Sequence, residues 1–166
     1  MLKQRLLYSL KQLLVGLSLV TYWGLASEAK AVVRIADDYG GRIGDYVSKY
    51  QDLRFSGEMV IIDSLCASAC TIVLGAVPHN QICVTARAKL GFHAAYDYGL
   101  NRVGSQVAVI NSDATSMLYH MYPPPIQSWL ARRGGLPAPR RLAILQGAEL
   151  MHLYRKCPSD QALRME

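Results

Sequence analysis

Three features of this sequence together could carry out nucleophilic serine chemistry. Ser68 lies in a run of small residues (CASACT), His93 follows on a later apolar segment, and a Gly40-Gly41 pair precedes both. A serine hydroxyl is a poor nucleophile until an adjacent imidazole takes its proton. The oxyanion that forms needs two backbone N–H donors, which the start of a helix and a glycine turn can supply. The sequence therefore indicates a Ser–His pair served by a glycine loop.

The elements that must position these residues are alternating strands and helices. Apolar β-branched runs predict strands over 32–35, 59–62, 81–85, 89–94 and 142–145, and helical spacing predicts helices over 42–53, 72–77, 111–122, 126–132 and 147–156. The first strand, helix and second strand together favour a right-handed βαβ unit with parallel strands. The expected fold class is α/β.

Composition places the chain among globular proteins. It has 166 residues, of which 51% are hydrophobic and 18% charged, and this excludes a disordered tail, collagen and a coiled coil. The length is that of one domain with a sizeable core. Half of the net charge of +6 lies in the first 31 residues. Because the remainder has only a small basic excess, a nucleic-acid partner is not expected.

Residues 1–31 are predicted to be a secretory signal peptide. Basic residues begin the segment, a short apolar run follows, and Ala29-Lys30-Ala31 offers small residues at a cleavage site. The alternative is an uncleaved anchor, which would be the chain's only link to a membrane, although the apolar run is short for a membrane span. On either interpretation, residues 32–166 form a single domain that is periplasmic or secreted.

The cysteines are even in number and all lie after this segment: Cys66, Cys70, Cys83 and Cys157. In an oxidising compartment this favours disulfides. Three pairings are possible, and we favour Cys66–Cys70 with Cys83–Cys157. A cysteine nucleophile paired with His93 is the alternative, but a free thiol tends to be oxidised there. The spacing does not match that of zinc ligands, so no metal or other cofactor is expected.

Residues 38–95 resemble the Clp-protease/crotonase superfamily, in particular its serine-peptidase branch and uncharacterised secreted bacterial proteins related to it. The matching features, in order, are DYGG at 38–41, MVIID at 59–63, CASA at 66–69 and LGFH at 90–93. The resemblance implies a single-domain spiral of ββα units. It also implies that Ser68 is the nucleophile and His93 the general base. The oxyanion hole would be formed by the N–H of Ala69 and that of Gly40 or Gly41.

The sequence departs from the superfamily where a catalytic acid is expected. That position falls near Arg140-Arg141, so the acid would come from Asp97, Asp113 or Glu149, or a backbone carbonyl would orient the imidazole of a Ser–His dyad. The resemblance implies a serine hydrolase, peptidase-like, acting on a peptide or protein. The alternative is a non-catalytic binding or assembly module on the same scaffold. Self-association into a homo-oligomer is expected under both.

Overall fold

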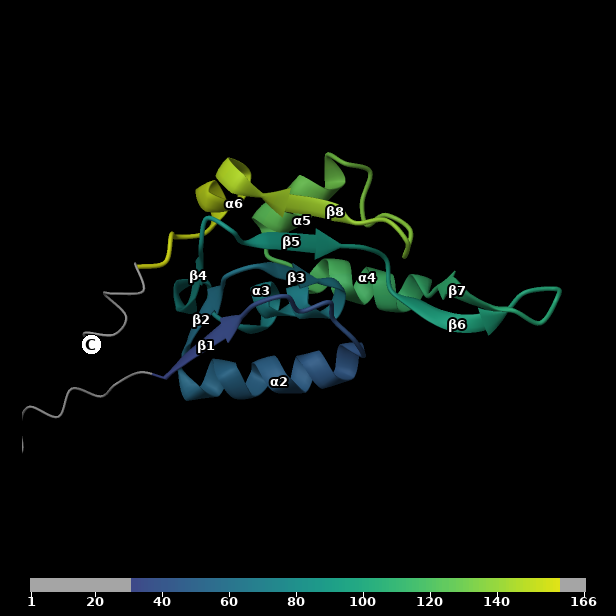
Figure 1. Cartoon of the computed structure of the whole chain (residues 1–166), viewed down its shortest axis with the longest axis horizontal. Coiled ribbons are helices and arrows are strands. Elements are labelled where there is room, and N and C mark those ends of the chain that lie inside the picture. Colours follow the sequence, from purple (N-terminus) through teal and green to yellow (C-terminus); the bar gives the residue numbers. More distant parts are fainter. Residues whose placement is uncertain (1–30, 159–166) are drawn as a thin grey trace, which may run out of the picture. The chain divides into compact units, whose positions relative to one another are not determined.

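A computed structural model of the chain describes residues 31–158, in which strands and helices alternate (Figure 1). The elements are β1 (Val32–Ile35), α2 (Ile43–Ser56), β2 (Met59–Ile62), β3 (Leu65–Ala67), the 3-10 helix η2 (Ser68–Ile72), α3 (Val73–Ala76), η3 (His79–Gln81), β4 (Ile82–Val84), β5 (Lys89–Phe92), β6 (Tyr96–Leu100), β7 (Gln106–Ile110), α4 (Ser112–Met121), α5 (Pro124–Ala131), β8 (Ala143–Gln146) and α6 (Gly147–Leu153). The mixed helix-and-strand content agrees with the predicted α/β class.

The predicted signal peptide lies outside the described residues except for Ala31. In the part of the chain that is described, no helix has the length and apolar character needed to cross a membrane.

Six of the eight strands in residues 31–158 form two three-stranded sheets, and β6 and β7 pair separately. The first has the order β1-β2-β4 and is parallel, with Val33 opposite Val60 and Ile62 opposite Val84. The second has the order β3-β5-β8, in which β3 and β5 are parallel and β8 runs antiparallel to β5. The predicted parallel βαβ unit, β1-α2-β2, is confirmed by the pairing of β1 with β2.

The chain passes repeatedly from the first sheet to the second. Strand β2 leads to β3, and β4 leads to β5. After β1, Asp38 forms a parallel bridge with Cys66, which extends the second sheet by one residue. Since Cys66 is also opposite Leu90, three successive passes of the chain lie in register beside one another. The segments that follow, which contain Gly40, Ser68 and His93, therefore leave the second sheet at the same edge.

The core lies under this edge and is rich in aromatic rings. Phe92 packs edge-on against Tyr122 with ring centroids 5.2 Å apart, and its ring lies 5.8 Å from that of Trp129. All three side chains are buried, with Tyr122 3% exposed. These ring contacts hold the end of β5 against Tyr122, which follows α4, and against Trp129 of α5. The next residue after Phe92 is His93.

The structure differs from the predicted elements around the site. The helix predicted over 42–53 continues to Ser56 and ends at Gly57, which has φ = 72°. The strand predicted over 89–94 ends at Phe92, so His93 lies in the following loop. The hairpin formed by β6 and β7 was not predicted, and in Figure 1 it extends away from the two sheets.

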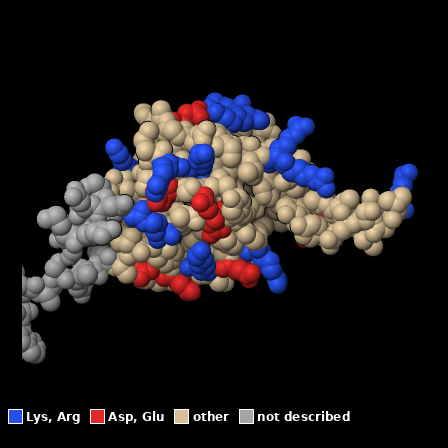
Figure 2. Space-filling model, viewed as in Figure 1, with Lys and Arg blue, Asp and Glu red and all other residues tan. Residues whose placement is uncertain are grey.

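Charged side chains do not gather into one patch on the face shown in Figure 2. Basic and acidic residues are interspersed over the sheets and helices there. This distribution agrees with the small basic excess counted for residues 32–166.

Candidate functional site

A cavity of about 610 Å³ lies beside the edge where the three chain passes leave the second sheet. Its lining includes the predicted nucleophile, base and oxyanion donors and one of the three candidate acids: Ser68, His93, Ala69, Gly40, Gly41 and Asp97. Its volume lies within the range of small-molecule and peptide sites. Both Ser68 and His93 are partly exposed, so a ligand in the cavity can reach them.

Ser68 has a backbone conformation that is rare for a residue with a side chain. Its φ is 56°, in the left-handed region, while the preceding Ala67 is extended. The chain turns sharply here from β3 into η2. A left-handed L-residue costs about 1–2 kcal/mol, so the surroundings must hold it in place. A serine on a strained strand-to-helix turn presents its hydroxyl outward, as nucleophilic serines do in other folds.

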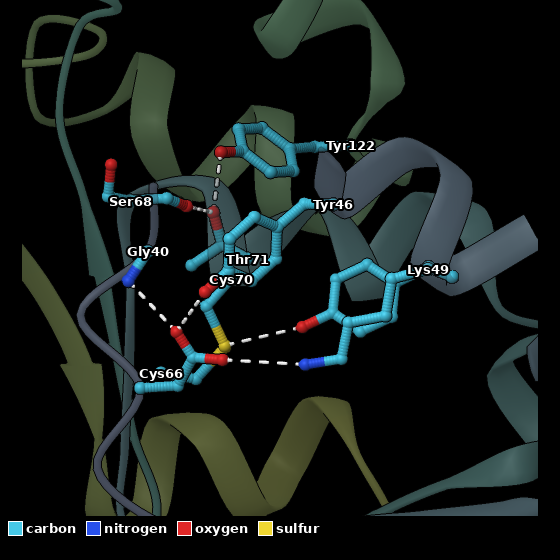
Figure 3. The surroundings of a disulfide bond; sticks show 10 residues. Gly40, Tyr46, Lys49, Cys66, Ser68, Cys70, Thr71 and Tyr122 are labelled. Atoms are coloured by element: carbon cyan, nitrogen blue, oxygen red, sulfur yellow. Dashed lines mark hydrogen bonds and ion pairs between the residues drawn. A yellow bond between two sulfur atoms is a disulfide. The ribbon is translucent and has the colours of Figure 1, made fainter. Parts of the chain in front are cut away.

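Thr71 holds the Ser68 turn from inside (Figure 3). Its hydroxyl lies 2.6 Å from the Ser68 carbonyl oxygen, to which it donates, and 2.7 Å from the Tyr122 hydroxyl. Thr71 is fully buried. Because burial raises the pKa of Tyr122 to about 12, its hydroxyl stays protonated at neutral pH and can donate to Thr71.

A disulfide encloses the same turn. Cys66, at the centre of β3, is bonded to Cys70, in η2, so the ring they close contains Ser68. The Tyr50 hydroxyl of α2 lies 3.5 Å from the Cys70 sulfur. The second disulfide joins Cys83 of β4 to Cys157. Both favoured pairings are therefore present in the structure.

Gly40 packs directly on the Ser68 turn. It has φ = 82°, and a Cβ atom there would lie 2.6 Å from Ser68 Cβ and 2.7 Å from the Ala67 carbonyl oxygen. Only glycine permits both this conformation and this approach. Gly41, by contrast, has room for a Cβ, with its nearest neighbour, Tyr46 Cε2, at 3.4 Å.

Asp38 determines which glycine N–H is available. Its Oδ1 accepts from the Gly40 N–H at 2.9 Å and from the Tyr46 hydroxyl at 2.5 Å, and its Oδ2 lies 3.7 Å from Lys49 Nζ (Figure 3). Burial, together with this hydrogen bond and the negative charge, raises the pKa of Tyr46 to about 12. Of the two predicted glycine donors, the Gly40 N–H is thus already bonded, which leaves the Gly41 N–H for a ligand.

His93 is oriented by the main chain. Its Nδ1 lies 2.8 Å from the carbonyl oxygen of Ala94. A carbonyl can only accept, so Nδ1 carries the proton, and in the neutral ring Nε2 has the free lone pair. This is the tautomer that a general base needs. Within residues 31–158, however, no hydrogen bond joins Ser68 Oγ to the His93 ring.

The three candidate acids occupy different places. Asp97 lines the cavity, and its Oδ2 accepts from Asn111 Nδ2 at 2.8 Å. Asp113 is exposed in the first turn of α4 and does not line the cavity, although its neighbours Asn111 and Ala114 do. Glu149 lies on α6, where hydrogen bonds from Trp129 and Arg133 lower the pKa of its carboxyl. Only Asp97 therefore shares the cavity with His93.

Four residues that build the site were missed by sequence reasoning. Asp38 and Tyr46 fix the glycine loop, and Thr71 and Tyr122 fix the serine turn. The position of Asp38 next to the Gly-Gly pair was a usable signal. No local pattern links Thr71 to Tyr122, because they are far apart in the sequence.

No protein-family model matches this chain, and no curated protein matches it in sequence. Among the described residues, no three His, Cys, Asp or Glu side chains form a group that could hold a metal ion.

Proposed function

We propose that this protein is a serine hydrolase, peptidase-like in its chemistry, that acts outside the cytoplasm. The observation that carries the proposal is the left-handed Ser68 at a strand-to-helix turn, in one cavity with His93 and the Gly40–Gly41 loop. Strained backbone of this kind persists where the surroundings impose it, and it clusters at active sites. Four contacts hold the Ser68 backbone in this conformation: the Cys66–Cys70 disulfide, the Thr71 hydroxyl, the packing of Gly40 and the pairing of β3 with β5.

In the proposed reaction, Ser68 Oγ attacks the carbonyl carbon of an amide or ester as His93 Nε2 takes the hydroxyl proton. The carbonyl oxygen becomes an oxyanion and accepts hydrogen bonds from the Gly41 and Ala69 N–H groups. Ala69 is near the start of η2, where N–H groups lack an acceptor within the helix. The imidazolium then gives its proton to the leaving amine or alcohol. Water hydrolyses the acyl-serine by the same steps.

The alternation of strands between two sheets supports a Clp-protease/crotonase spiral as the fold. Successive passes contribute β2 then β3, and β4 then β5, with helical turns between them. Within such a fold the edge that carries Gly40, Ser68 and His93 would be the catalytic edge. Self-association remains a prediction of this proposal.

One observation favours the second candidate function, a non-catalytic binding module. The described residues hold no carboxylate hydrogen-bonded to His93, whose Nδ1 is occupied by a carbonyl, and Ser68 is not bonded to the ring. Catalytic hydrogen bonds are often long in the absence of substrate, so this geometry is compatible with either function.

The two disulfides are consistent with a periplasmic or extracellular location, where such bonds persist. This agrees with the predicted signal peptide, and a peptide or protein is the substrate that a peptidase-like site would take.

Labelling of the oxidised protein with a fluorophosphonate probe tests the proposal, since the probe reacts with an activated serine. We expect labelling that is lost in Ser68→Ala and strongly slowed in His93→Gln. Ser48→Ala and His120→Gln are matched controls, because both residues are exposed and outside the cavity. A folded wild-type protein that is not labelled, or a Ser68→Ala variant that is still labelled, would contradict the hydrolase and favour the binding module.

A further inference from the structure

Some polar groups that line the cavity have hydrogen-bond partners within residues 31–158, and others have none there. Two of its acceptor atoms already have partners: Asp97 Oδ2 accepts from Asn111 Nδ2 at 2.8 Å, and Asn111 Oδ1 accepts from the Ala114 N–H at 2.9 Å. Two lining N–H groups, those of Gly41 and Ala69, are assigned above to the oxyanion. One charged lining residue, Arg42, has no assignment. The guanidinium of Arg42 is therefore a set of donors in the cavity that no other role uses, and it suits a ligand with a carboxylate or another acceptor-rich group.

Arg42 is the only lysine or arginine among the residues that line this cavity. Three arginines of the described chain form ion pairs, Arg34 and Arg87 with Asp63 and Arg133 with Glu149, and all three lie outside the cavity. No ion pair or hydrogen bond in residues 31–158 involves the Arg42 side chain. Its guanidinium is thus free to bind a group that the protein does not supply.

Arg42 lies next in the chain to Gly41, whose N–H is a proposed oxyanion donor. Its backbone is therefore anchored beside that donor. Guanidinium groups bind carboxylates through two parallel hydrogen bonds, which makes them selective for that shape and charge. Tyr39 and Tyr98 line the same cavity, and both are largely exposed, so such a pair would form at a site open to solvent.

We propose that Arg42 selects substrates that carry a carboxylate close to the scissile bond, such as peptides with an acidic side chain there. This inference rests on the proposed function for the placement of the scissile bond. The preference for an anionic ligand itself rests only on the cavity and the unpaired guanidinium.

Binding to the Ser68→Ala variant tests the preference without catalysis. The probes are N-acetylated alanine tetrapeptide amides in which one position at a time is Glu or Gln, and NMR titration gives each dissociation constant. We expect Glu to bind about 3- to 10-fold more tightly than Gln at one position, as a partly exposed ion pair with good geometry would give. The difference should shrink at high salt.

The matched variants are Arg42→Gln and Arg54→Gln in the same Ser68→Ala background. Arg54 is an exposed arginine in the last turn of α2, outside the cavity, so its replacement should leave the Glu preference unchanged. Arg42→Gln should abolish the preference, and Arg42→Lys should keep only part of it because lysine lacks the bidentate fork.

Two results would overturn the inference: no difference between Glu and Gln at any position, which includes the case that none of the peptides binds, or a Glu preference that survives Arg42→Gln. Failure of the proposed function gives a different pattern. The wild-type protein would then resist the fluorophosphonate, while the Glu preference and its dependence on Arg42 would both remain.

Discussion

The carboxylate of Asp38 accepts a hydrogen bond from the N–H of Gly40 at 2.9 Å. The same residue is bonded through its main chain to β3 on either side of Cys66: its N–H donates to the Leu65 carbonyl at 2.7 Å, and its carbonyl accepts from the Ala67 N–H at 2.8 Å. Asp38 therefore ties the glycine loop and the serine turn to each other. The glycine loop that carries the Gly41 N–H and the serine turn that carries the Ala69 N–H are thus joined through Asp38.

Replacement of Asp38 by Ala should loosen this connection. The Gly40 N–H and the Tyr46 hydroxyl would lose their acceptor, so the free energy of unfolding should fall by about 1–3 kcal/mol in urea titrations. Asp52→Ala, at an exposed position of α2, should change it by less than about 0.5 kcal/mol. Equal losses in the two variants would show that the Asp38 contacts contribute little.

The two glycines of the loop should respond differently to alanine. Gly40→Ala combines a positive φ with contacts below 3 Å to Ser68 and its neighbours, and we expect a loss of about 2–4 kcal/mol. Gly41→Ala has room for its methyl group and should cost less than about 1 kcal/mol. Thermal unfolding of both variants measures the contrast, and a tolerated Gly40→Ala would argue against the close packing on Ser68.

The backbone strain at Ser68 can be measured with two substitutions that both remove the hydroxyl. Glycine adopts φ = 56° without steric cost and alanine does not, so Ser68→Gly should be more stable than Ser68→Ala by about 1 kcal/mol. Urea unfolding midpoints compare the two. If Ser68→Ala is the more stable variant, the turn is not strained.

The disulfides should contribute unequally to stability. Cys83–Cys157 closes a long loop, with a sequence separation of 74, whereas Cys66–Cys70 has a separation of only 4. Loop-closure entropy then predicts a loss of about 4 kcal/mol for the Cys83→Ala/Cys157→Ala pair and about 2 kcal/mol for the Cys66→Ala/Cys70→Ala pair. The short-loop variant should nevertheless show the larger drop in fluorophosphonate labelling at equal folded fraction. If the Cys83→Ala/Cys157→Ala variant lost more labelling than the Cys66→Ala/Cys70→Ala variant, the Cys66–Cys70 bond would not be needed to hold the serine turn.

Asp63 should make the fold sensitive to acid. It is 6% exposed and bonded to Arg34 at 2.9 Å and Arg87 at 2.6 Å. Burial alone would raise the pKa of this carboxyl, but hydrogen bonds with Thr85, Arg87 and Arg34 hold it below its ordinary value. A lowered pKa in the folded state stabilises the protein above the unfolded pKa of about 4. That stabilisation is lost as the pH falls further.

The variant Asp63→Asn tests this linkage. Its free energy of unfolding should be lower than that of the wild type by about 1–3 kcal/mol at neutral pH. The gap should narrow as the pH falls below about 4, where the carboxyl of the unfolded chain takes up a proton, and close only below the lowered pKa of the folded state. A gap that stays constant with pH would mean that the charge of Asp63 is not what stabilises the fold.

The first two strands could be predicted to the residue. Met59–Ile62 is an apolar run between Glu58 and Asp63, and Val32–Ile35 is a short β-branched run between two alanines, so the composition of each marks it locally as a strand. The favoured disulfide pairing is present, although the number of cysteines alone leaves three pairings open. The clustering of Gly40, Ser68 and His93 followed from their places at the ends of predicted strands.

Other parts of the site depend on contacts that a local pattern does not contain. The hairpin of β6 and β7 carries Asp97 and Gly99 within a strand, and its register is set by cross-strand pairing of Tyr96 with Ile110. The left-handed φ of Ser68 is imposed by Thr71 and the disulfide, whereas serine itself does not favour it. The bond from Gly40 to Asp38, which leaves Gly41 as the available donor, became visible only with the three-dimensional structure.

The disulfides pair the first cysteine with the second and the third with the fourth. A chain that is oxidised as it emerges from its N-terminus can therefore close each bond with the next cysteine to appear. For such a chain the native pairing requires no exchange between disulfides. The Cys83–Cys157 bond fastens the C-terminal segment beside β4, where Lys156 pairs with Val84, whereas the serine turn is closed by a bond of its own.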